Sequence, residues 1–232
     1  MASSPPPSDA PVLESVVVSN MSETERGGLA VVVLQGWGAP GDDLVSLARR
    51  LEGPRSRFFV PAAPLPKGPN GRAWWSLEPG QRPVHAWHDA APPDYRPHAQ
   101  VTSARRAVQR LVRDIRSRYR PERVALVGFS QGGMLSLDVA LAGDPPIDRV
   151  GVLSGLIIAD SLTGLHAARA PRPTFLVSHG RADSVLPFEA GESTARLLEK
   201  YGFATTFLAF DGGHTIPLEV VSALKTFLHS GP

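Results

Sequence analysis

Short apolar runs alternate along this chain with longer segments in which apolar residues recur every three or four positions. Residues 29–34 form a continuous run rich in β-branched side chains, which is typical of a strand covered on both faces. Similar runs predict an edge strand over residues 12–19 and further strands over 57–60, 123–127, 149–153, 174–178 and 205–209. Amphipathic spacing predicts helices over residues 42–51, 101–119, 132–142, 188–201 and 218–228. This alternation indicates βαβ units, and we expect an α/β fold with one mostly parallel sheet that carries helices on both faces.

One segment interrupts the alternation. Residues 61–97 hold nine prolines and three glycines together with Trp74, Trp75 and Trp87. A structureless loop of this length is usually functional or disordered, and three tryptophans favour a packed loop. The sequence His-x-x-His-Asp at residues 85–89 suggests a metal site as an alternative. Because neither a helical pattern nor a clear fourth ligand accompanies it, we predict no metal site in this protein.

Composition narrows the class of protein. The chain has 232 residues, enough for one domain with a substantial core, and it has no cysteine. Disulfide frameworks, zinc–thiolate sites, iron–sulfur clusters and cysteine nucleophiles are therefore excluded. The net charge is only +2, so we expect no nucleic-acid partner. Arginines gather on the outer face of the helix over residues 101–119, where a solvated face is the favoured interpretation and an anion-binding surface the alternative.

The sequence carries no signal for membrane insertion or export. No apolar run approaches the about 20 residues that a membrane span needs. Residues 2–11 are rich in serine and proline and lack the apolar core of a signal peptide. We therefore expect a disordered leader over residues 1–11, one folded domain over residues 12–232 and a cytoplasmic location. A homodimer is left open.

Residues 128–132 have the sequence Gly-Phe-Ser-Gln-Gly, a G-x-S-x-G motif between a predicted strand and a predicted helix. This context is typical of a nucleophile elbow, in which a strained turn holds a serine at the carboxyl end of the sheet. The small residues let the strand and helix backbones pass closely. Ser130 is therefore the candidate nucleophile, and the alternative is a glycine-rich turn with an idle serine.

A serine nucleophile needs a histidine base and a carboxylate that orients it, and in this topology both follow later in the chain. Among four downstream histidines, His214 follows the last predicted strand, whereas His179 precedes the expected acid position. Asp183 follows the strand over residues 174–178 by a short loop, at the strand end where catalytic groups gather. The rival Asp211 lies three residues before His214 and is expected to shape the turn.

The remaining site residues are backbone donors and pocket side chains. Stabilisation of an oxyanion needs two backbone N–H groups. We assign one to Gln131, directly after the nucleophile, and the other to Trp37 in the glycine-rich loop after residue 34. The candidates for the substrate pocket are Trp74, Trp75, Leu186 and Ile216. For the two tryptophans, anchoring of the core or of the loop is the alternative.

Together these motifs resemble the α/β-hydrolase superfamily, and most closely its phospholipase/carboxylesterase branch, which includes the acyl-protein thioesterases. The matching motifs are residues 34–38, 42–51, 61–64, 73–75, 128–133, 178–187 and 213–216. The resemblance implies a compact hydrolase without a lid domain that needs no cofactor. It implies a catalytic triad of Ser130, Asp183 and His214. In two departures, Gln35 stands where the family usually has histidine, and residues 67–97 look longer than in compact members.

The motifs and the resemblance predict a serine hydrolase that cleaves small carboxylic esters of short to medium acyl chains through an acyl-enzyme. One alternative keeps the mechanism and changes the substrates to thioesters of S-acylated proteins or to lysolipids. Another alternative is a non-catalytic binding module on a hydrolase scaffold, which the complete triad in the expected order disfavours.

Overall fold

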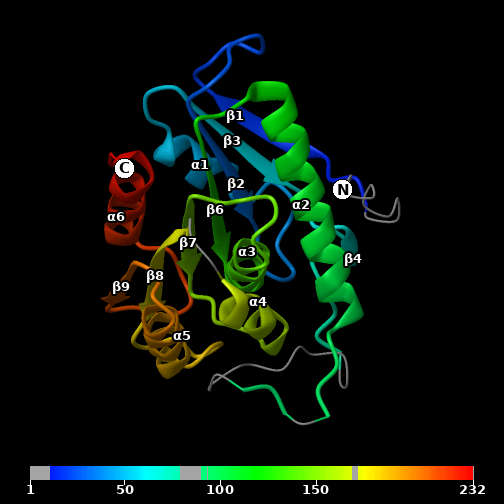
Figure 1. Cartoon of the computed structure of the whole chain (residues 1–232), viewed down its shortest axis with the longest axis vertical. Helices are drawn as coiled ribbons and strands as arrows, with labels where there is room; N and C mark the ends of the chain where they lie inside the picture. The colour runs from blue at the N-terminus through cyan, green and yellow to red at the C-terminus, as the bar shows by residue number, and fades with distance from the viewer. Residues whose placement is uncertain (1–10, 79–89, 93, 169–171, 232) are drawn as a thin grey trace.

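Seven strands form the central sheet of this computed structural model, which describes residues 11–78, 90–92, 94–168 and 172–231 (Figure 1). They are β1 (Ser15–Ser19), β2 (Leu29–Leu34), β3 (Ser56–Pro61), β6 (Arg123–Phe129), β7 (Arg149–Leu153), β8 (Thr174–Gly180) and β9 (Thr205–Phe210). Their order across the sheet is β1-β3-β2-β6-β7-β8-β9. The edge strand β1 pairs antiparallel with β3, and all other neighbours are parallel. The carboxyl ends of the parallel strands therefore share one edge, where ligands bind in open α/β sheets.

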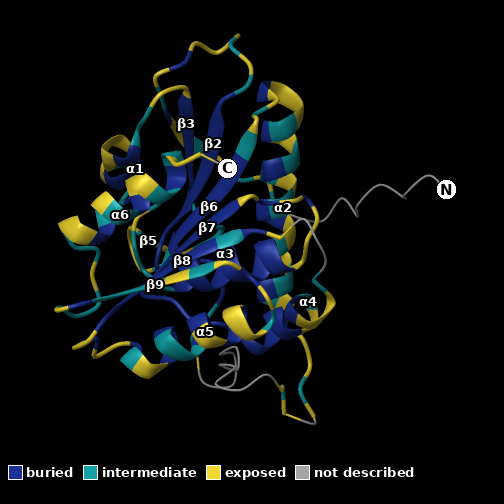
Figure 2. Ribbon diagram, turned by 60° about the vertical axis from the view of Figure 1, so that its left-hand side comes forward, coloured by how far each residue is buried: buried dark blue, intermediate teal, exposed yellow. Residues whose placement is uncertain are grey.

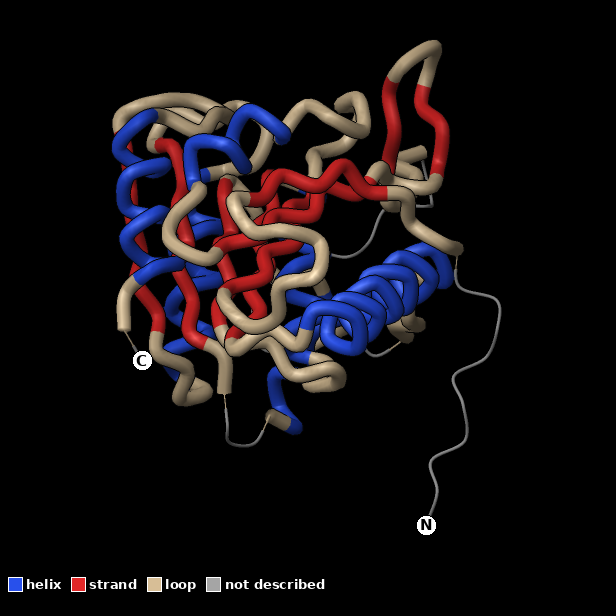
Figure 3. Tube along the Cα trace, turned by 90° about the horizontal axis from the view of Figure 1, so that it is seen from above, coloured by secondary structure: helices blue, strands red, loops and turns tan. Residues whose placement is uncertain are grey.

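Helices cover both faces of the sheet, and the strands lie between them (Figure 3). One face carries α1 (Val45–Leu51) and α6 (Leu218–His229). The other face carries α2 (Ala99–Tyr119), α3 (Gln131–Leu141), α4 (Leu162–Ala167), preceded by the 3-10 helix η1 (Ala159–Ser161), and α5 (Phe188–Lys200). None of the helices in the described ranges is long and apolar enough to cross a membrane.

Burial of both faces explains the continuous apolar strands. Successive side chains of β2 point to opposite faces, so its six residues divide between two apolar clusters. One cluster takes Ala30, Val32 and Leu34, and the other takes Leu29, Val31 and Val33. The sheet is accordingly buried along its central strands, while the outer faces of the helices are exposed (Figure 2). The predicted α/β fold is confirmed.

Most elements differ from the prediction by one to three residues at one or both ends, and two of these differences have local reasons. The helix α1 begins at Val45 instead of residue 42, because the preceding residues form a turn in which Asp42 O accepts the Val45 N–H (3.1 Å). The strand β8 continues to Gly180, two residues beyond the predicted end, because Gly180 still pairs with Phe210 of β9.

The proline-rich segment is ordered where the structure describes it. The prediction of a structureless loop is wrong for residues 65–73, where β4 (Leu65–Lys67) and β5 (Gly71–Ala73) form an antiparallel hairpin. The prediction of packing is confirmed for Trp74 and Trp75, each 1% exposed. Trp87, the His-x-x-His-Asp sequence at residues 85–89 and residues 1–10 of the expected leader lie outside the described residues.

Ion pairs connect the arginine-rich face of α2 to neighbouring elements. The pairs are Arg113 with Asp144 (2.9 Å), Arg116 with Asp148 (3.7 Å) and Arg118 with Glu23 (3.8 Å). Because each of these arginines has its own acidic partner, their charges do not converge on a common ligand. The contacts favour a solvated face over an anion-binding surface.

Candidate active site

The turn between β6 and α3 holds Ser130 in a strained backbone conformation. Its φ of 53° and ψ of −117° lie where residues other than glycine are rare. A Cβ at Gly128 would lie 2.1 Å from Gly132 O, and a Cβ at Gly132 would lie 2.1 Å from Leu34 O. Both contacts are with backbone atoms that cannot move aside, so only glycine fits at either position. The Ser130 N–H donates to Leu153 O (2.8 Å) and ties the turn to β7.

Loops after β8 and β9 bring an acid and a base together. His214 Nδ1 lies 2.7 Å from Asp183 Oδ2, and the side chain of Asp183 is fully buried. The other carboxylate oxygen accepts the N–H groups of Val185 (2.8 Å) and Leu186 (2.9 Å). Burial raises the pKa of the Asp183 carboxyl, but the hydrogen bonds from Leu186, His214 and Val185 outweigh it and hold the pKa below its usual value. The carboxylate is therefore ionised at neutral pH and orients the His214 ring.

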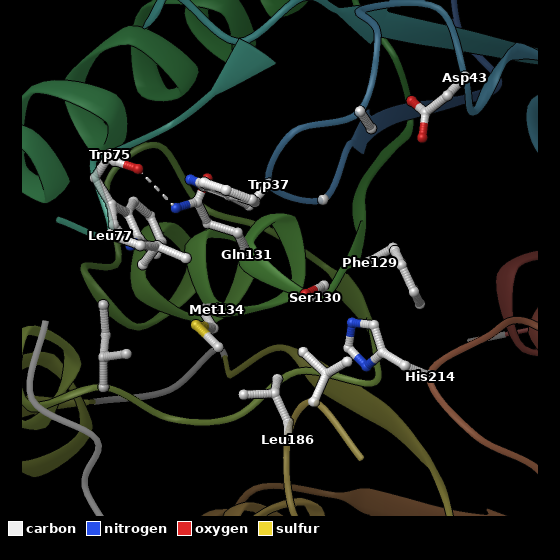
Figure 4. Close-up of a pocket in the computed structure, with 14 residues that line it drawn as sticks. Trp37, Asp43, Trp75, Leu77, Phe129, Ser130, Gln131, Met134, Leu186 and His214 are labelled. Carbon is white, nitrogen blue, oxygen red and sulfur yellow. Dashed lines mark hydrogen bonds between the residues drawn. The ribbon is translucent and has the colours of Figure 1, made fainter. Parts of the chain in front are cut away.

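Ser130 and His214 face the same cavity (Figure 4). The ring of Phe129 packs against His214 with their centroids 4.8 Å apart. Within the described part of the chain, no hydrogen bond joins the Ser130 hydroxyl to His214. Such bonds are often long in unliganded enzymes and shorten in the substrate complex. The structure thus brings Ser130, Asp183 and His214 to one site.

At the cavity, neither the Trp37 N–H nor the Gln131 N–H donates a hydrogen bond to another described residue. Gln131 begins α3, and the first N–H groups of a helix have no partner within it. The loop that carries Trp37 is braced by Gln35, whose Nε2 donates to Ala39 O (2.6 Å) and whose carbonyl accepts Trp74 Nε1–H (3.0 Å). Glutamine at position 35 therefore fixes this loop by hydrogen bonds.

The side chain of Gln131 has a second role that the sequence analysis missed. Its Oε1 accepts the Trp74 N–H (2.8 Å) and its Nε2 donates to Trp75 O (2.9 Å), as Figure 4 shows for the second bond. The buried amide thus joins the elbow to the segment after β5. An amide side chain carries a donor and an acceptor on adjacent atoms, which fits the N–H and C=O of two successive residues, and the glutamine in the motif was the signal for such a bridge.

The cavity has a volume of about 500 Å³ and a mainly apolar lining. Trp75 and Leu186 line it, whereas Trp74 and Ile216, which were also predicted for the pocket, are not among its lining residues. Trp74 is buried with its indole N–H committed to a backbone carbonyl, and Ile216 packs against the core on the face of α1 and α6. Further apolar lining residues are Leu77, Met134, Ile158 and Val185. Among the described residues, no group of three His, Cys, Asp or Glu side chains is placed to hold a metal ion.

Asp43 is a further lining residue that the sequence analysis did not place in the site. In the view of Figure 4, Asp43 and Trp75 lie on opposite sides of Ser130. Burial raises the pKa of the Asp43 carboxyl to about 6, and the charge of Asp42 adds to the increase. Its Oδ1 is buried without a hydrogen-bond partner in the described ranges. One end of the cavity is therefore apolar and the other carries a carboxyl group.

Comparison with known proteins gives matches along most of the chain. A sequence model of the phospholipase/carboxylesterase family matches residues 14–230. Acyl-protein thioesterase 1 of Neurospora crassa is 27% identical over 218 residues, which cover 88% of this chain and 86% of that protein. A probable carboxylesterase of Oryza sativa subsp. japonica is 36% identical over 110 residues, which cover 47% of this chain and only 41% of that relative.

The solved structures agree in fold. The crystal structure of esterase PE8 matches with a TM-score of 0.75 and 27% identity, over 94% of this chain and 98% of that one. Arabidopsis thaliana SOBER1, in its F65L form, matches with a TM-score of 0.70 and 25% identity, over 86% of this chain and 97% of that one.

Substitution of Gly132 by alanine tests the close contact at the elbow. We expect Gly132→Ala to lower the free energy of unfolding by about 3 kcal/mol, because its Cβ would meet Leu34 O at 2.1 Å. Gly143→Ala is the matched control, since nothing lies within 4 Å of its Cβ and only its backbone conformation is strained, which costs about 1 kcal/mol. Urea unfolding measures the free energy of unfolding of both variants. An equal loss in the two would contradict a steric role for the contact between Gly132 and Leu34.

The raised pKa of Asp43 predicts a pH-dependent effect of removing its charge. Because the pKa in the folded state lies above the usual 3.8, ionisation costs stability above pH 6 and costs nothing below pH 3.8. Asp43→Asn is therefore expected to raise the free energy of unfolding at pH 8 by about 1 kcal/mol, a value reduced from the full shift because the group is partly exposed. The gain should vanish near pH 4. A gain that is the same at both pH values in urea unfolding would refute this account.

Proposed function

The chain belongs to the phospholipase/carboxylesterase family, and on that premise we propose that it is a serine hydrolase acting on small carboxylic esters. The observation that carries the proposal is the His214 ring, held at 2.7 Å by a buried, ionised Asp183 and facing Ser130 in an apolar cavity. A hydroxyl is a weak nucleophile by itself, and a histidine oriented by a carboxylate is the arrangement that activates it.

In the first half-reaction, Ser130 Oγ attacks the acyl carbonyl carbon while His214 Nε2 takes the hydroxyl proton. Asp183 keeps the other ring nitrogen protonated and stabilises the positive charge that develops on the ring. The carbonyl oxygen becomes an oxyanion, and the unpartnered N–H groups of Trp37 and Gln131 are its donors. Collapse of the tetrahedral intermediate breaks the ester bond, and His214 gives its proton to the leaving alcohol. The product of this step is an acyl-enzyme at Ser130.

In the second half-reaction, water attacks the acyl-enzyme as His214 takes one of its protons. The same N–H groups hold the second oxyanion, and Ser130 regains its proton when the carboxylic acid leaves. The chain and water carry every proton in this scheme, so the proposal requires no cofactor.

The lining of the cavity supports a short to medium acyl chain. Trp75, Leu77 and Met134 provide an apolar wall on one side of Ser130 (Figure 4). The volume of about 500 Å³ lies within the range of small-molecule sites and must hold the leaving group as well as the acyl chain. Burial of each methylene in such a wall contributes about 0.8 kcal/mol, so binding should favour acyl chains longer than acetyl.

A thioester substrate is the second candidate. It is favoured by the relative named acyl-protein thioesterase 1, which matches this chain over most of both lengths. The chemistry requires no new residue, because a thiolate leaves more readily than an alkoxide and the oxyanion donors are the same. S-acylated proteins and lysolipids belong to this candidate, and a cytoplasmic location would suit either one.

Substitution of the nucleophile tests the mechanism. We expect wild-type protein to show a burst with p-nitrophenyl butyrate, and Ser130→Ala to lower kcat by about 10⁴–10⁶. Ser184→Ala is the matched control, because this exposed serine lies in the loop that carries Asp183 and has no role in the scheme. Stopped-flow absorbance measures both variants. Activity of Ser130→Ala near the wild-type value would refute the assignment.

Acyl length and leaving group separate the two candidates. We expect kcat/KM for p-nitrophenyl esters to rise about fourfold per methylene from acetate until the cavity is filled, and then to fall. Leu77→Trp narrows the apolar side and should lower the octanoate-to-acetate ratio of kcat/KM by about tenfold. A steady decline from acetate upward would contradict the apolar acyl site. A higher kcat/KM for the matched thioester than for the oxygen ester would favour the second candidate.

A further inference from the structure

Two histidines contact the same oxygen of the buried carboxylate. His214 Nδ1 lies 2.7 Å from Asp183 Oδ2, and His179 Nε2 lies 3.3 Å from the same oxygen while it donates its hydrogen bond to Leu186 O. The His179 side chain is completely buried, and it does not line the cavity. His179 therefore approaches Asp183 from inside the protein, while His214 approaches it from the cavity.

The bond to Leu186 O fixes the tautomer of His179. Its Nε2 lies 3.0 Å from Leu186 O, and a carbonyl oxygen can only accept, so Nε2 carries the proton. Its Nδ1 has no hydrogen-bond partner in the described part of the chain. That nitrogen faces the backbone of α5, where a Cβ at Gly191 would come within 2.5 Å of it. The ring thus has one orientation, in which its donor binds Leu186 O and the same nitrogen lies 3.3 Å from Asp183 Oδ2.

The same contacts hold a residue of the cavity wall. The Leu186 N–H donates to Asp183 Oδ1 (2.9 Å), and the Leu186 carbonyl accepts from His179. Leu186 is therefore fixed at both its backbone groups, and its side chain lines the cavity beside His214. His179, Asp183 and Leu186 form a closed set of contacts in which the position of each depends on the other two.

We propose that His179 is a positioning residue of the proposed hydrolase, which sets the Asp183 carboxylate and the Leu186 backbone so that His214 is held in its productive orientation. This inference rests on the proposed function. The His179 ring lies 3.3 Å from Asp183 Oδ2 and holds Leu186, whose N–H donates to the other carboxylate oxygen, so both sides of the carboxylate are in contact with this set. A misplacement of a catalytic group by about 1 Å can lower turnover by about 100-fold. Loss of the His179 contacts should therefore lower kcat even though His179 touches no substrate.

The chain contains a matched comparison for a purely structural histidine. His229 Nε2 lies 2.9 Å from Leu51 O, and a Cβ at Gly53 would lie 2.4 Å from its ring. His229 therefore has the same two contacts as His179, a backbone carbonyl and a glycine packed on the ring. It contacts no carboxylate in the described ranges, and it lies in α6, away from the cavity.

The test compares His179→Leu, His179→Gln and His229→Leu. For each variant, Tm, kcat and KM for p-nitrophenyl butyrate and the downfield proton resonance of the Asp183–His214 hydrogen bond are measured. We expect His179→Leu to lower kcat by about 10- to 100-fold with a smaller change in KM, and to shift or broaden the resonance. His179→Gln keeps an N–H donor of similar reach and should recover kcat to within about threefold and restore the resonance. His229→Leu should lower Tm and leave kcat and the resonance unchanged.

Other results would overturn the proposal. A kcat of His179→Leu within twofold of wild type, or an unchanged resonance, would show that His179 only packs in the core and does not position the catalytic groups. If His179→Leu does not fold, Gly191→Ala takes its place, because its Cβ would press on Nδ1 and displace the ring. An unchanged kcat and resonance in folded Gly191→Ala would then be decisive against the proposal. Failure of the proposed function is a separate outcome, because the wild-type protein would then show no turnover. The downfield resonance of wild type and His179→Leu would still be compared in that case.

Discussion

The close backbone contact between Gly132 and Leu34 is the constraint on which the site depends. It lets α3 begin directly against the end of β2, which no residue with a side chain would allow. The same approach forces Ser130 into its strained conformation at the end of β6. Because Leu34 immediately precedes Gln35 and the loop of Trp37, the contact also brings both candidate oxyanion donors to the nucleophile. A single steric requirement thus positions the nucleophile and its two N–H groups together.

Buried amides then join the proline-rich segment to this framework. The Gln131 side chain binds two adjacent backbone groups at Trp74 and Trp75, the Gln35 side chain accepts the Ala63 N–H, and the Gln35 backbone carbonyl accepts the Trp74 indole N–H. In a buried environment an unmade hydrogen bond costs about 1–3 kcal/mol, so each of these satisfied groups specifies one arrangement of the loop. The apolar wall at Trp75 is therefore positioned by polar contacts behind it. This explains how a segment with few regular elements provides a defined cavity.

The local sequence pattern was sufficient to predict the fold and to select the three residues of the candidate triad. The continuous apolar run of β2 required two covered faces, and the order of Ser130, Asp183 and His214 followed from the elbow and the strand ends. The errors concern contacts between distant segments. Trp74 is an anchor because its indole N–H binds the backbone carbonyl of Gln35, and a local sequence pattern cannot show that these two segments meet. Asp43 falls within the range predicted as a helix, but it lies in the turn before α1 and lines the cavity. His179 was set aside as a base by its position, and its contact with Asp183 depends on the extension of β8 to Gly180.

The central claim is that Ser130 is a nucleophile activated by His214 and Asp183. Reaction with a fluorophosphonate probe, read by intact mass and peptide mapping, tests this claim without knowledge of the natural substrate. The account predicts a single adduct on Ser130 in the wild-type protein, none in Ser130→Ala, and labelling at least about 100-fold slower in His214→Ala. A folded wild-type protein that remains unlabelled, or an adduct on another residue, would contradict it.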